Sequence, residues 1–570
     1  MINEIKNRNE LADLLGIQRQ RLTYLLYVKG LDNMYTSFSI PKKNGDSRII
    51  NAPNKELKYI QSKLAEELYL YRKKLMEEKE LIGGVSQAFE KGKNIFTNAL
   101  VHRNKRYVIN MDLENFFDSF HFGRVRGFFL KSREFELPNE VATVLAKIVC
   151  CDGKLPQGAP TSPIISNMIC NIFDIRIIKL AKKYRLDYTR YADDLTFSTN
   201  DKNYLMNKEQ FYIEIKKEIE KAGFHINEDK TRISYNSSRQ EVTGIITNKK
   251  INIKREYYKK TRAMAHCLYK TGEYKIDSEN GIAGTINQLE GRFAFINQAD
   301  KFDNIHFGDK RSFYKLNGRE KEYKKFLFYK YFFANDKPLV VTEGKTDVLY
   351  IKSALKKLYK DYPELITKDD KGVFKYYISF LKKSNRLAYF LNIQIDGADS
   401  IGNIYSYYTD KDDINYPSYM NKFQELQGKN PDNPVIMLFD NELNDKKRPI
   451  AKFCKNNVDD SQIEQLKISG YSLLSSNLYL MTTPLVKRNG ISDIEDLFEK
   501  EILDIELDGK KFCKADRYDI HKFYGKDRFS KYIVNNYKDI NFDNFRPLLD
   551  NLLKIKKEYN DYRTRSSRKD

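Results

Sequence analysis

Residues 188–197 read YTRYADDLTF and place two adjacent carboxylates, Asp193 and Asp194, between two runs of β-prone residues. Another β-prone run, YVINMD at residues 107–112, ends in Asp112. Carboxylates that meet at neighbouring strand ends can hold two Mg²⁺ ions, which activate an attacking hydroxyl and brace a triphosphate. An adjacent Asp pair alone is more often a solvated turn. Because a third carboxylate accompanies the pair, we expect Asp112 and Asp193 to bind metal directly and Asp194 to support them.

The segment between these strands, LPQGAPTSP at residues 155–163, is rich in Pro and Gly. Alone it would be an ordinary loop before a helix. Its place after Asp112 and before the Asp pair makes it resemble the LPQG…SP motif of reverse transcriptases, which are RNA-directed DNA polymerases. That resemblance implies that Gln157 and the backbone of Gly158 lie against the incoming nucleotide and the template.

Four further positions match nucleotide-contacting positions of the same family. Phe117 matches a bulky side chain below the sugar that would clash with a 2′-hydroxyl, although a core aromatic residue on the next helix is the plain alternative. Lys43 and Arg48, in the Asn-Gly hairpin of residues 37–48, fall where the family contacts the triphosphate. Lys230 resembles a later Lys motif, whose cation would neutralise or protonate the departing pyrophosphate. Each basic residue, taken singly, is more often a solvated side chain.

Two short strings indicate a narrower family. Residues 98–102 read NALVH and residues 242–244 read VTG, which match the NAxxH and VTG elements that distinguish bacterial retron reverse transcriptases. Either string alone would recur by chance, but both lie at the expected places around a complete set of polymerase motifs. The resemblance implies a role in RNA binding for Asn98, His102, Val242, Thr243 and Gly244.

The retron resemblance covers residues 1 to about 315 and implies a specific partner and product. The partner is a cognate structured noncoding RNA that serves as template and supplies the priming 2′-hydroxyl of an internal guanosine. The product, made from dNTPs, is a branched RNA-linked single-stranded DNA (msDNA). Group II intron proteins are the closest rival family, but the C-terminus has no zinc-binding or His-Asn-His endonuclease pattern.

The length and composition of the chain indicate what kind of protein it is. The 570 residues exceed one core, so two or three domains are expected. A formal charge of +22 favours a phosphate backbone or an anionic surface as partner. No apolar run could span a bilayer, no signal peptide is recognisable, and none of the six cysteines lies in a CxxC pair. We expect a soluble cytoplasmic protein, without a membrane segment and with reduced cysteines.

The chain divides into two parts, with a boundary between about residues 315 and 336. For the first part, the resemblance implies an α+β right-hand polymerase, with fingers and palm in residues 1–250 and a helical thumb in residues 251–330 that grips the duplex through phosphates. Buried-strand patterns that alternate with helices predict an α/β domain with a parallel sheet in residues 336–500. Residues 501–570 predict a charged, helical C-terminal extension.

Two expected strand ends in the second part carry acidic residues. VVTEGKTD at residues 340–347 and MLFDNE at residues 437–442 resemble the two signatures of a TOPRIM domain, which topoisomerases, primases and OLD-type nucleases share. The carboxyl ends of parallel strands meet at one edge of a sheet, where α/β folds assemble their sites. The pair of signatures therefore predicts a second carboxylate site, of the nuclease kind because no primase zinc module or topoisomerase tyrosine motif is recognisable.

The expected ligands of this second site are four carboxylates. Glu343, Asp440 and Glu442 would hold Mg²⁺ that activates water against a phosphodiester, with Asp347 as a further ligand one helical turn from Glu343. The usual pattern has Asp at the position of Glu442, so Asp445 is an alternative ligand. A later acidic pair, residues 495–496, is more plausibly a plain helix surface.

The two sets of motifs leave three hypotheses for the whole chain. In the first, a retron reverse transcriptase is fused to a TOPRIM nuclease effector in antiphage defence, and fusion keeps effector and DNA at high effective concentration. In the second, the C-terminal half is a non-catalytic nucleic-acid-binding scaffold. In the third, the nuclease trims the RNA or the DNA product. The nuclease target (DNA, messenger RNA or transfer RNA) and a homo-oligomeric state stay open.

Overall fold

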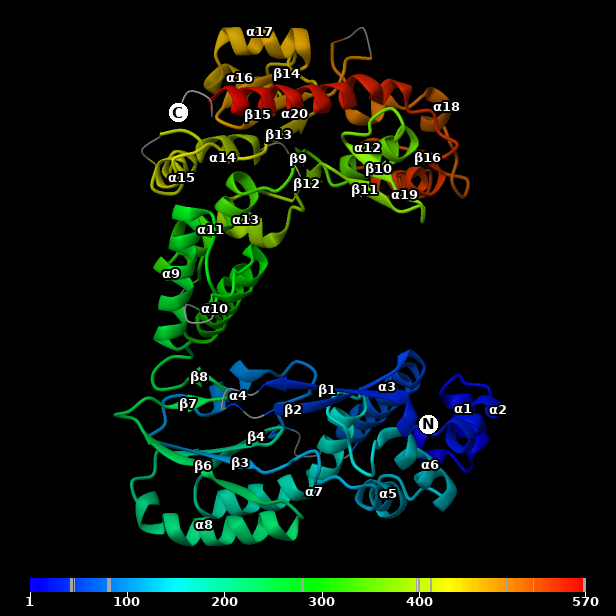
Figure 1. Cartoon of the computed structure of the whole chain (residues 1–570), viewed down its shortest axis with the longest axis vertical. Helices are drawn as coiled ribbons and strands as arrows, with labels where there is room; N and C mark the ends of the chain where they lie inside the picture. Colours follow the sequence, from blue (N-terminus) through cyan, green and yellow to red (C-terminus); the bar gives the residue numbers. More distant parts are fainter. Residues whose placement is uncertain are drawn as a thin grey trace. The chain divides into compact units, whose positions relative to one another are not determined.

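The computed structural model describes residues 1–41, 45, 47–78, 84–277, 281–308, 310–395, 397, 400–410, 413–486, 490–515 and 517–566. The chain forms two units, the first made of Met1–Arg255 and Ala299–His306, the second of Glu256–Gln298 and Phe307–Asp570. Figure 1 shows the helices and strands of each unit, coloured along the sequence. No described helix is both long enough and apolar enough to cross a membrane.

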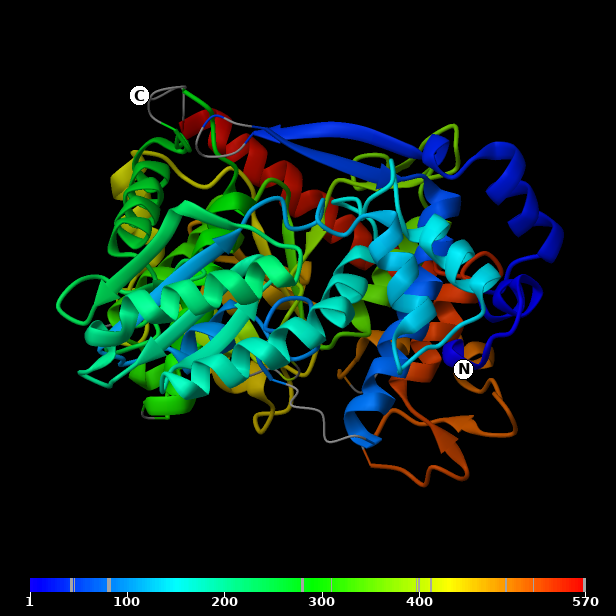
Figure 2. The same cartoon turned by 90° about the horizontal axis from the view of Figure 1, so that it is seen from below.

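The first unit contains a long hairpin near its N-terminus. β1 (Tyr35–Pro41) and β2 (Ser47–Pro53) pair antiparallel, which confirms the hairpin predicted around the Asn-Gly step. Figure 2 shows this hairpin as an extended two-stranded ribbon. The helices of the unit are α1 (Arg8–Leu14), α2 (Arg19–Tyr24), α3 (Lys55–Glu78), α4 (Ile95–Val101), α5 (Phe122–Lys131), α6 (Asn139–Val149), α7 (Ser162–Lys183) and α8 (Tyr204–Lys221).

A four-stranded antiparallel sheet lies at the centre of the first unit, with strand order β4-β5-β3-β6. Its strands are β3 (Tyr107–Leu113), β4 (Asp187–Tyr191), β5 (Asp194–Thr199) and β6 (Ile226–Tyr235). α8 covers one face, where the Phe211 ring lies 5.2 Å from that of Phe197 (Figure 1). β7 (Glu241–Val242) and β8 (Ile245–Ile246) form a separate short hairpin. The β-prone runs thus become three adjacent strands of the sheet, β4, β5 and β3.

The second unit begins with helices that share a hydrophobic core with a C-terminal sheet. α9 (Arg255–Thr271), the part of α10 (Ile286–Phe307) up to Gln298, and α11 (Gly318–Phe328) contribute buried aromatic residues such as Phe326 to the same core as Phe439 of the sheet. The predicted thumb helices therefore pack with the residues predicted to form the α/β domain. The division into a thumb and a separate C-terminal domain stays a prediction.

The sheet of the second unit has five strands in the order β12-β9-β13-β15-β14. β12, β9, β13 and β15 run parallel to one another, and β14 joins the edge antiparallel to β15. The bounds are β9 (Leu339–Thr342), β12 (Ser379–Phe380), β13 (Val435–Phe439), β14 (Tyr471–Ser475) and β15 (Leu478–Thr482). β9, β13 and β15 are buried throughout, as expected for parallel strands with both faces covered.

Helices cover the two faces of this sheet. On one face, Val340, Ile436 and Leu438 share a core with Leu552 of the last helix, so the charged C-terminal residues are an integral layer of the unit. The other helices of the unit are α12 (Asp347–Lys357), α13 (Asn385–Leu391), α14 (Ser400–Ser406), α15 (Tyr419–Gln427), α16 (Pro449–Asn457), α17 (Asp460–Ser469), α18 (Lys500–Leu503), α19 (Lys526–Asn536) and α20 (Arg546–Ser566). Short strand pairs complete it: β10 (Ile366–Lys368) with β11 (Phe374–Tyr376), and β16 (Lys511–Phe512) with β17 (Phe523–Tyr524).

Candidate active sites

Three carboxylates gather at one end of the first sheet. Asp112 of β3 lies directly opposite Asp194, the first residue of β5, in the antiparallel register. Asp193 occupies the turn between β4 and β5, and its carbonyl accepts a hydrogen bond from the Leu113 amide at 3.0 Å. The structure therefore brings together the three residues predicted to bind metal.

A buried ion pair supports the turn that carries Asp193. The Arg190 side chain has no solvent exposure, and its Nε and Nη2 donate to the two carboxylate oxygens of Asp174 at 2.9 and 2.8 Å. Its Nη1 donates to the Ala192 carbonyl at 3.2 Å. Ala192 has a φ of 56°, a left-handed conformation that is costly for a residue with a side chain. Arg190, for which the sequence predicts no role, thus holds the turn in a strained conformation.

Burial and like charges make this end of the sheet a candidate cation site. Burial raises the pKa of Asp194 to about 7, and Asp193 and Asp112 add to the rise. Burial also raises the pKa of Asp193, with a contribution from Asp112, while Lys230 and Arg48 oppose the rise. Lys230 Nζ donates to Asp112 Oδ2 at 2.8 Å. A divalent cation would relieve the repulsion, and three carboxylates are a donor set that suits Mg²⁺.

The predicted nucleotide-binding loop is joined to the hairpin. The Asn51 amide donates to the Gln157 carbonyl at 2.8 Å. Gly158 has a φ of 120°, and a Cβ there would lie 2.9 Å from the Asn51 carbonyl oxygen and from Ile50 Cγ2. Glycine is required because a side chain would both clash with backbone and strain the chain. The loop and β2 therefore form one continuous surface.

The other predicted nucleotide contacts differ in how the structure places them. Arg48 lies exposed on β2, near enough to lower the pKa of Asp193. Lys43 lies outside the described residues. Phe117 lies in the turn after β3, partly exposed, with its ring 5.3 Å from that of the buried Phe116. Phe117 is therefore neither on a helix nor fully within the core, and its role as a sugar gate stays a prediction.

The two retron strings meet in one buried hydrogen-bond network. His102 Nδ1 contacts Ser198 Oγ at 2.8 Å and its Nε2 contacts Thr189 Oγ1 at 2.7 Å. Thr189 Oγ1 also donates to Asn98 Oδ1 at 2.5 Å, and Asn98 Nδ2 donates to Thr243 Oγ1 at 3.4 Å. Burial, with a smaller effect of Lys105, lowers the pKa of His102 to about 3, so its ring is neutral. The network fixes α4 and the β7–β8 turn to strands β4 and β5.

The residues of the retron strings differ in their exposure to solvent. Asn98, His102 and Val242 have no solvent exposure in this structure, and their role in RNA binding stays a prediction. Gly244 is exposed at the tip of the β7–β8 turn, next to Thr243. Both have positive φ, 45° at Thr243 and 85° at Gly244. RNA contact by this turn stays a prediction.

The second group of carboxylates lies at the carboxyl edge of the parallel sheet. Glu343 follows β9, Asp347 is the first residue of α12, and Asp440 follows β13. The Gly344 amide donates to Asp347 Oδ2 at 2.7 Å, and the Ile494 amide donates to Asp440 Oδ1 at 3.1 Å. The strand ends thus place Glu343, Asp347 and Asp440 together, as the sequence predicts.

Burial and mutual repulsion disfavour ionisation of these carboxylates. Burial raises the pKa of Asp347 to about 7, with further increases from Glu495 and Glu343. Burial also raises the pKa of Asp440 well above its usual value, and Asp347, Glu343 and Glu495 add to this effect. The pKa of Glu343 is raised by burial as well. Buried carboxylate oxygens that repel one another suit a divalent cation, because its positive charge would favour the ionised forms of the carboxylates.

Glu442 and Asp445, the two alternatives for the remaining ligand, share one cation. Arg448 Nε lies 3.4 Å from Glu442 Oε1 and 3.5 Å from Asp445 Oδ2. Glu442 still lies near enough to raise the pKa of Glu343, after the larger effect of burial. The structure therefore does not separate the two candidates by their partners.

Glu495 belongs to the second group, although the sequence favoured a helix surface for it. Its side chain has no solvent exposure, and Lys526 Nζ lies 3.1 Å from its Oε2. The interpretation as a helix surface is therefore wrong. Glu495 stands among other acidic residues in the string DIEDLF, and Lys526 lies in a charged segment. Neither sequence context indicates a buried side chain, so the burial of these two residues was not recognisable from the sequence.

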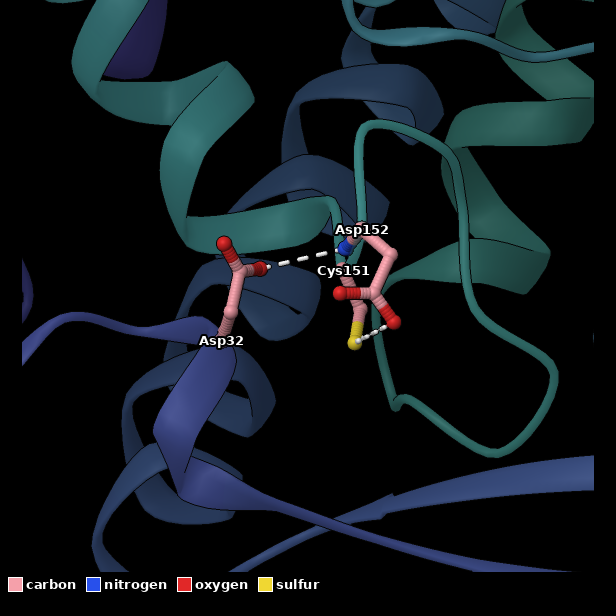
Figure 3. A group of neighbouring side chains, drawn as sticks. All are labelled: Asp32, Cys151 and Asp152. Atoms are coloured by element: carbon pink, nitrogen blue, oxygen red, sulfur yellow. Dashed lines mark hydrogen bonds between the residues drawn. The ribbon is translucent and has the colours of Figure 1, made fainter.

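A further acidic group lies elsewhere in the first unit. Among the described residues, only Asp32, Cys151 and Asp152 place three potential ligand atoms within 4.8 Å of one another (Figure 3). The Asp152 amide donates to Asp32 Oδ1 at 3.1 Å, which accounts for the proximity of the chain segments. Burial, with contributions from Asp152 and Asp32, raises the pKa of the Cys151 thiol to about 12, so the thiolate needed for metal binding is disfavoured.

Comparison with known proteins places the first part of the chain in a family. A sequence profile of the reverse transcriptases (RNA-dependent DNA polymerases) matches residues 40–254. The retron Mx162 reverse transcriptase of Myxococcus xanthus is 32% identical over 333 residues, which cover 52% of this chain and 65% of that protein. The retron Ec86 reverse transcriptase of Escherichia coli is 33% identical over 299 residues, which cover 52% of this chain and 85% of that protein.

Similarity to solved structures is weaker. A structure of apo telomerase from Candida tropicalis shares 16% identity over 42% of this chain and 61% of that chain, with a TM-score of 0.30, too low to support an argument. The sequence matches decide the assignment, because the Ec86 protein is matched over most of its length and the profile spans the three carboxylates of the first sheet. The chain therefore belongs to the retron reverse transcriptases.

Proposed function

We propose that this chain is an RNA-directed DNA polymerase that copies a cognate structured noncoding RNA into branched, RNA-linked single-stranded DNA. The observation that best supports the polymerase is the register that sets Asp112 opposite Asp194, with Asp193 in the adjoining turn. The relatives' names support the retron type of reaction. The RNA would serve as template and as primer, and dNTPs would be the substrates.

The residues of the first site have distinct parts in this reaction. Two Mg²⁺ ions, when bound, would activate the priming hydroxyl and stabilise the departing pyrophosphate. Asp112, Asp193 and Asp194 would hold them. Lys230, paired with Asp112 in this structure, would neutralise or protonate the pyrophosphate, and Arg48 would attract the triphosphate. The Gln157–Gly158 loop, fixed to β2, would support the base pair being formed.

Template and metal requirements test the polymerase. Purified protein is expected to extend a DNA primer on an RNA template with dNTPs, and chelation of Mg²⁺ is expected to stop synthesis because the carboxylates alone cannot stabilise the pyrophosphate. Readdition of Mg²⁺ after chelation is the control for irreversible loss of protein. Synthesis on DNA templates but never on RNA, or synthesis that persists in the chelator, would contradict the proposal.

For the second unit we propose a Mg²⁺-dependent TOPRIM nuclease. Its support is the placement of Glu343, Asp347 and Asp440 at the carboxyl edge of neighbouring parallel strands, each with a raised pKa. Raised pKa values caused by burial and by like charges are typical of functional sites. A nuclease joined to a DNA-making enzyme would suit an antiphage effector that the reverse-transcribed DNA restrains until infection.

Substitution of the second set of carboxylates separates the nuclease from its alternatives. Glu343→Ala and Asp440→Ala are expected to abolish toxicity of the expressed chain, since each removes a metal ligand from the cleavage site. Both should leave the protein folded, because buried carboxylates with raised pKa values oppose folding at neutral pH. Glu501→Ala, at an exposed acidic position, is the matched control.

Growth of the expressing cells and the length of the DNA product are the two measurements. A scaffold would keep its cellular effect in both variants, and a processing nuclease would give longer DNA or RNA without a change in toxicity. Relief of toxicity with unchanged product length is the outcome that the effector proposal requires. Wild-type toxicity that persists in Glu343→Ala would contradict it.

A further inference from the structure

Phe89 combines an exposed aromatic ring with a strained backbone. The residue is 42% exposed and lies outside the hydrophobic core that the described residues of its unit form. Its φ is 61°, and among the described non-glycine residues with positive φ it is the only aromatic one. This conformation is costly for a bulky side chain, and such strain is found mainly at functional sites, where the surroundings fix it. Packing of the ring therefore does not account for the conformation of Phe89.

Two side chains fix the backbone around Phe89. The Asn167 side chain is buried, and its Nδ2 donates to the Ala88 carbonyl at 2.9 Å and to Glu90 Oε1 at 3.0 Å. The Tyr69 hydroxyl donates to the Phe89 carbonyl itself at 3.2 Å. Tyr69 belongs to α3 and Asn167 to α7. The strained conformation is therefore held by two helices, and not by the Phe89 ring.

The same asparagine is bonded to the support of the first carboxylate site. Asn167 Oδ1 accepts a hydrogen bond from Arg190 Nη2 at 3.3 Å. Arg190 Nη1 in turn donates to the Ala192 carbonyl, in the turn that carries Asp193. One buried amide thus connects the segment around Phe89 with the turn of the polymerase site.

The backbone of this segment also pairs with β4. The Arg190 amide donates to the Val85 carbonyl, and the Arg190 carbonyl accepts a hydrogen bond from the Gln87 amide, both at 2.8 Å. In the strand order β4-β5-β3-β6, β4 is an edge strand. Phe89, two residues after Gln87, therefore lies close to the β4 edge of the sheet.

The strand order indicates which nucleic-acid strand would meet this edge. The primer end has to reach the carboxylates, which lie on β3, on β5 and in the turn between β4 and β5. Lys230, whose predicted partner is the triphosphate, lies on β6 at the opposite edge. The base of a nucleotide points away from its triphosphate, so the template that pairs with this base lies toward β4.

We propose that Phe89 is a template-contacting residue of the polymerase, whose ring packs against a nucleotide of the RNA template beside the base pair being formed. An aromatic ring suits this part because it can stack on any base and so tolerates any template sequence. The bonds from Asn167 and Tyr69 hold the ring in place before the template binds. This inference rests on the proposed polymerase, and it assigns a contact outside the motifs that mark the family.

Phe89→Gly separates a template contact from a structural role. Glycine adopts a positive φ without steric cost, and relief of the strain offsets the freedom that glycine adds to the unfolded chain. The melting temperature of the variant is therefore not expected to fall. Phe89→Tyr keeps an aromatic ring and should bind template as the wild type does. Tyr235→Ala, at a position that is 43% exposed in the same unit, is the matched control.

Single-turnover primer extension by the full chain, at increasing concentrations of a DNA primer annealed to an RNA template, measures the effect. Phe89→Gly is expected to raise the apparent Kd for the template–primer by at least about fivefold, the effect of losing one base–aromatic stack. The maximal rate should stay within about twofold, because the carboxylates are unchanged. An unchanged Kd in Phe89→Gly, whether or not its melting temperature falls, would overturn the proposal.

A second measurement uses the wild-type chain and does not depend on folding of a variant. The template carries 5-iodouridine at successive positions near the primer end, and ultraviolet light joins this base to an aromatic ring that stacks on it. Trypsin should release the crosslinked base on the peptide of residues 80–91, with the link at Phe89. A link at Phe89 from iodouracil in the primer strand but never from the template would overturn the assignment to the template.

The two measurements separate failure of this inference from failure of the polymerase. DNA synthesis by the wild type without any crosslink at Phe89 would overturn the contact and leave the polymerase standing. A crosslink from the template to Phe89 in a chain that makes no DNA would support the contact and contradict the polymerase.

Discussion

Asp193→Ala is expected to lower RNA-templated DNA synthesis by at least about a thousandfold. The substitution removes a carboxylate from a site where metal ions supply several kcal/mol of charge stabilisation, and about 4 kcal/mol corresponds to roughly that factor. No neighbouring side chain can replace it, because Asp112 is paired with Lys230 and Asp194 occupies its own position opposite Asp112. Primer extension on RNA under single-turnover conditions gives the rate.

Folding has to be retained for this result to be informative. Burial and Asp112 both raise the pKa of Asp193, so removing this carboxylate relieves repulsion and should not lower the melting temperature. Asp187→Ala, at an exposed position at the start of β4, is the matched control and should retain full synthesis. A rate for Asp193→Ala within tenfold of wild type would contradict the assigned metal site.

Arg190→Met is expected to destabilise the first unit by about 3–5 kcal/mol, the usual cost of breaking a buried ion pair by removing one partner. Asp174 would keep a buried charge that has lost both guanidinium hydrogen bonds, and the Ala192 carbonyl would lose its donor. Because that carbonyl belongs to the turn before Asp193, DNA synthesis should also fall. Hydrogen exchange of the amides in β4 and β5 measures the loss of stability locally.

Two further variants give this prediction its controls. Arg190→Met combined with Asp174→Leu removes both charges and should recover much of the lost stability, since no unpaired charge remains. Arg185→Met, at an exposed surface pair with Asp201 at 3.6 Å, should cost less than about 1 kcal/mol. Amide protection in Arg190→Met equal to that in Arg185→Met would show that the buried pair does not hold the turn.

The sequence predicted the elements of the first site because local patterns determine them. The runs at residues 107–112 and 188–197 are β-prone on both sides of their carboxylates, and antiparallel pairing then brings Asp112 opposite Asp194. The strand-end positions of Glu343 and Asp440 followed from the same reasoning for a parallel sheet. At these positions each acidic residue directly follows or interrupts a β-prone run, so the sequence pattern alone indicates where the carboxylate lies on the sheet.

The features that were missed depend on burial, which local patterns do not reveal. Asn98 and His102 are polar residues in a short string, and only the packed structure shows that their partners are Thr189 and Ser198. Glu495 is an acidic residue in a mixed string, yet it is enclosed by elements far along the chain, including Lys526. From sequence alone, a polar residue is assigned to the surface unless the residue that it pairs with is known.

For the C-terminal helix α20, the sequence did contain a pattern that indicates burial. Leu548, Leu552, Ile555 and Tyr559 recur at helical spacing within a charged segment and are all buried in the core of the second sheet. The charged composition of this segment suggested a helical extension. The helical spacing of its apolar residues instead predicts a helix with one face packed against the protein, which is what the structure shows.

The nucleic acid bound to the protein shows whether the chain makes branched, RNA-linked DNA. Wild-type protein and Asp193→Ala would be expressed with the neighbouring genomic RNA and purified, and the bound nucleic acid sequenced before and after treatment with a debranching enzyme. We expect a short single-stranded DNA joined to RNA through a 2′ linkage, absent from Asp193→Ala. Unbranched DNA, or no DNA from an active polymerase, would contradict this expectation.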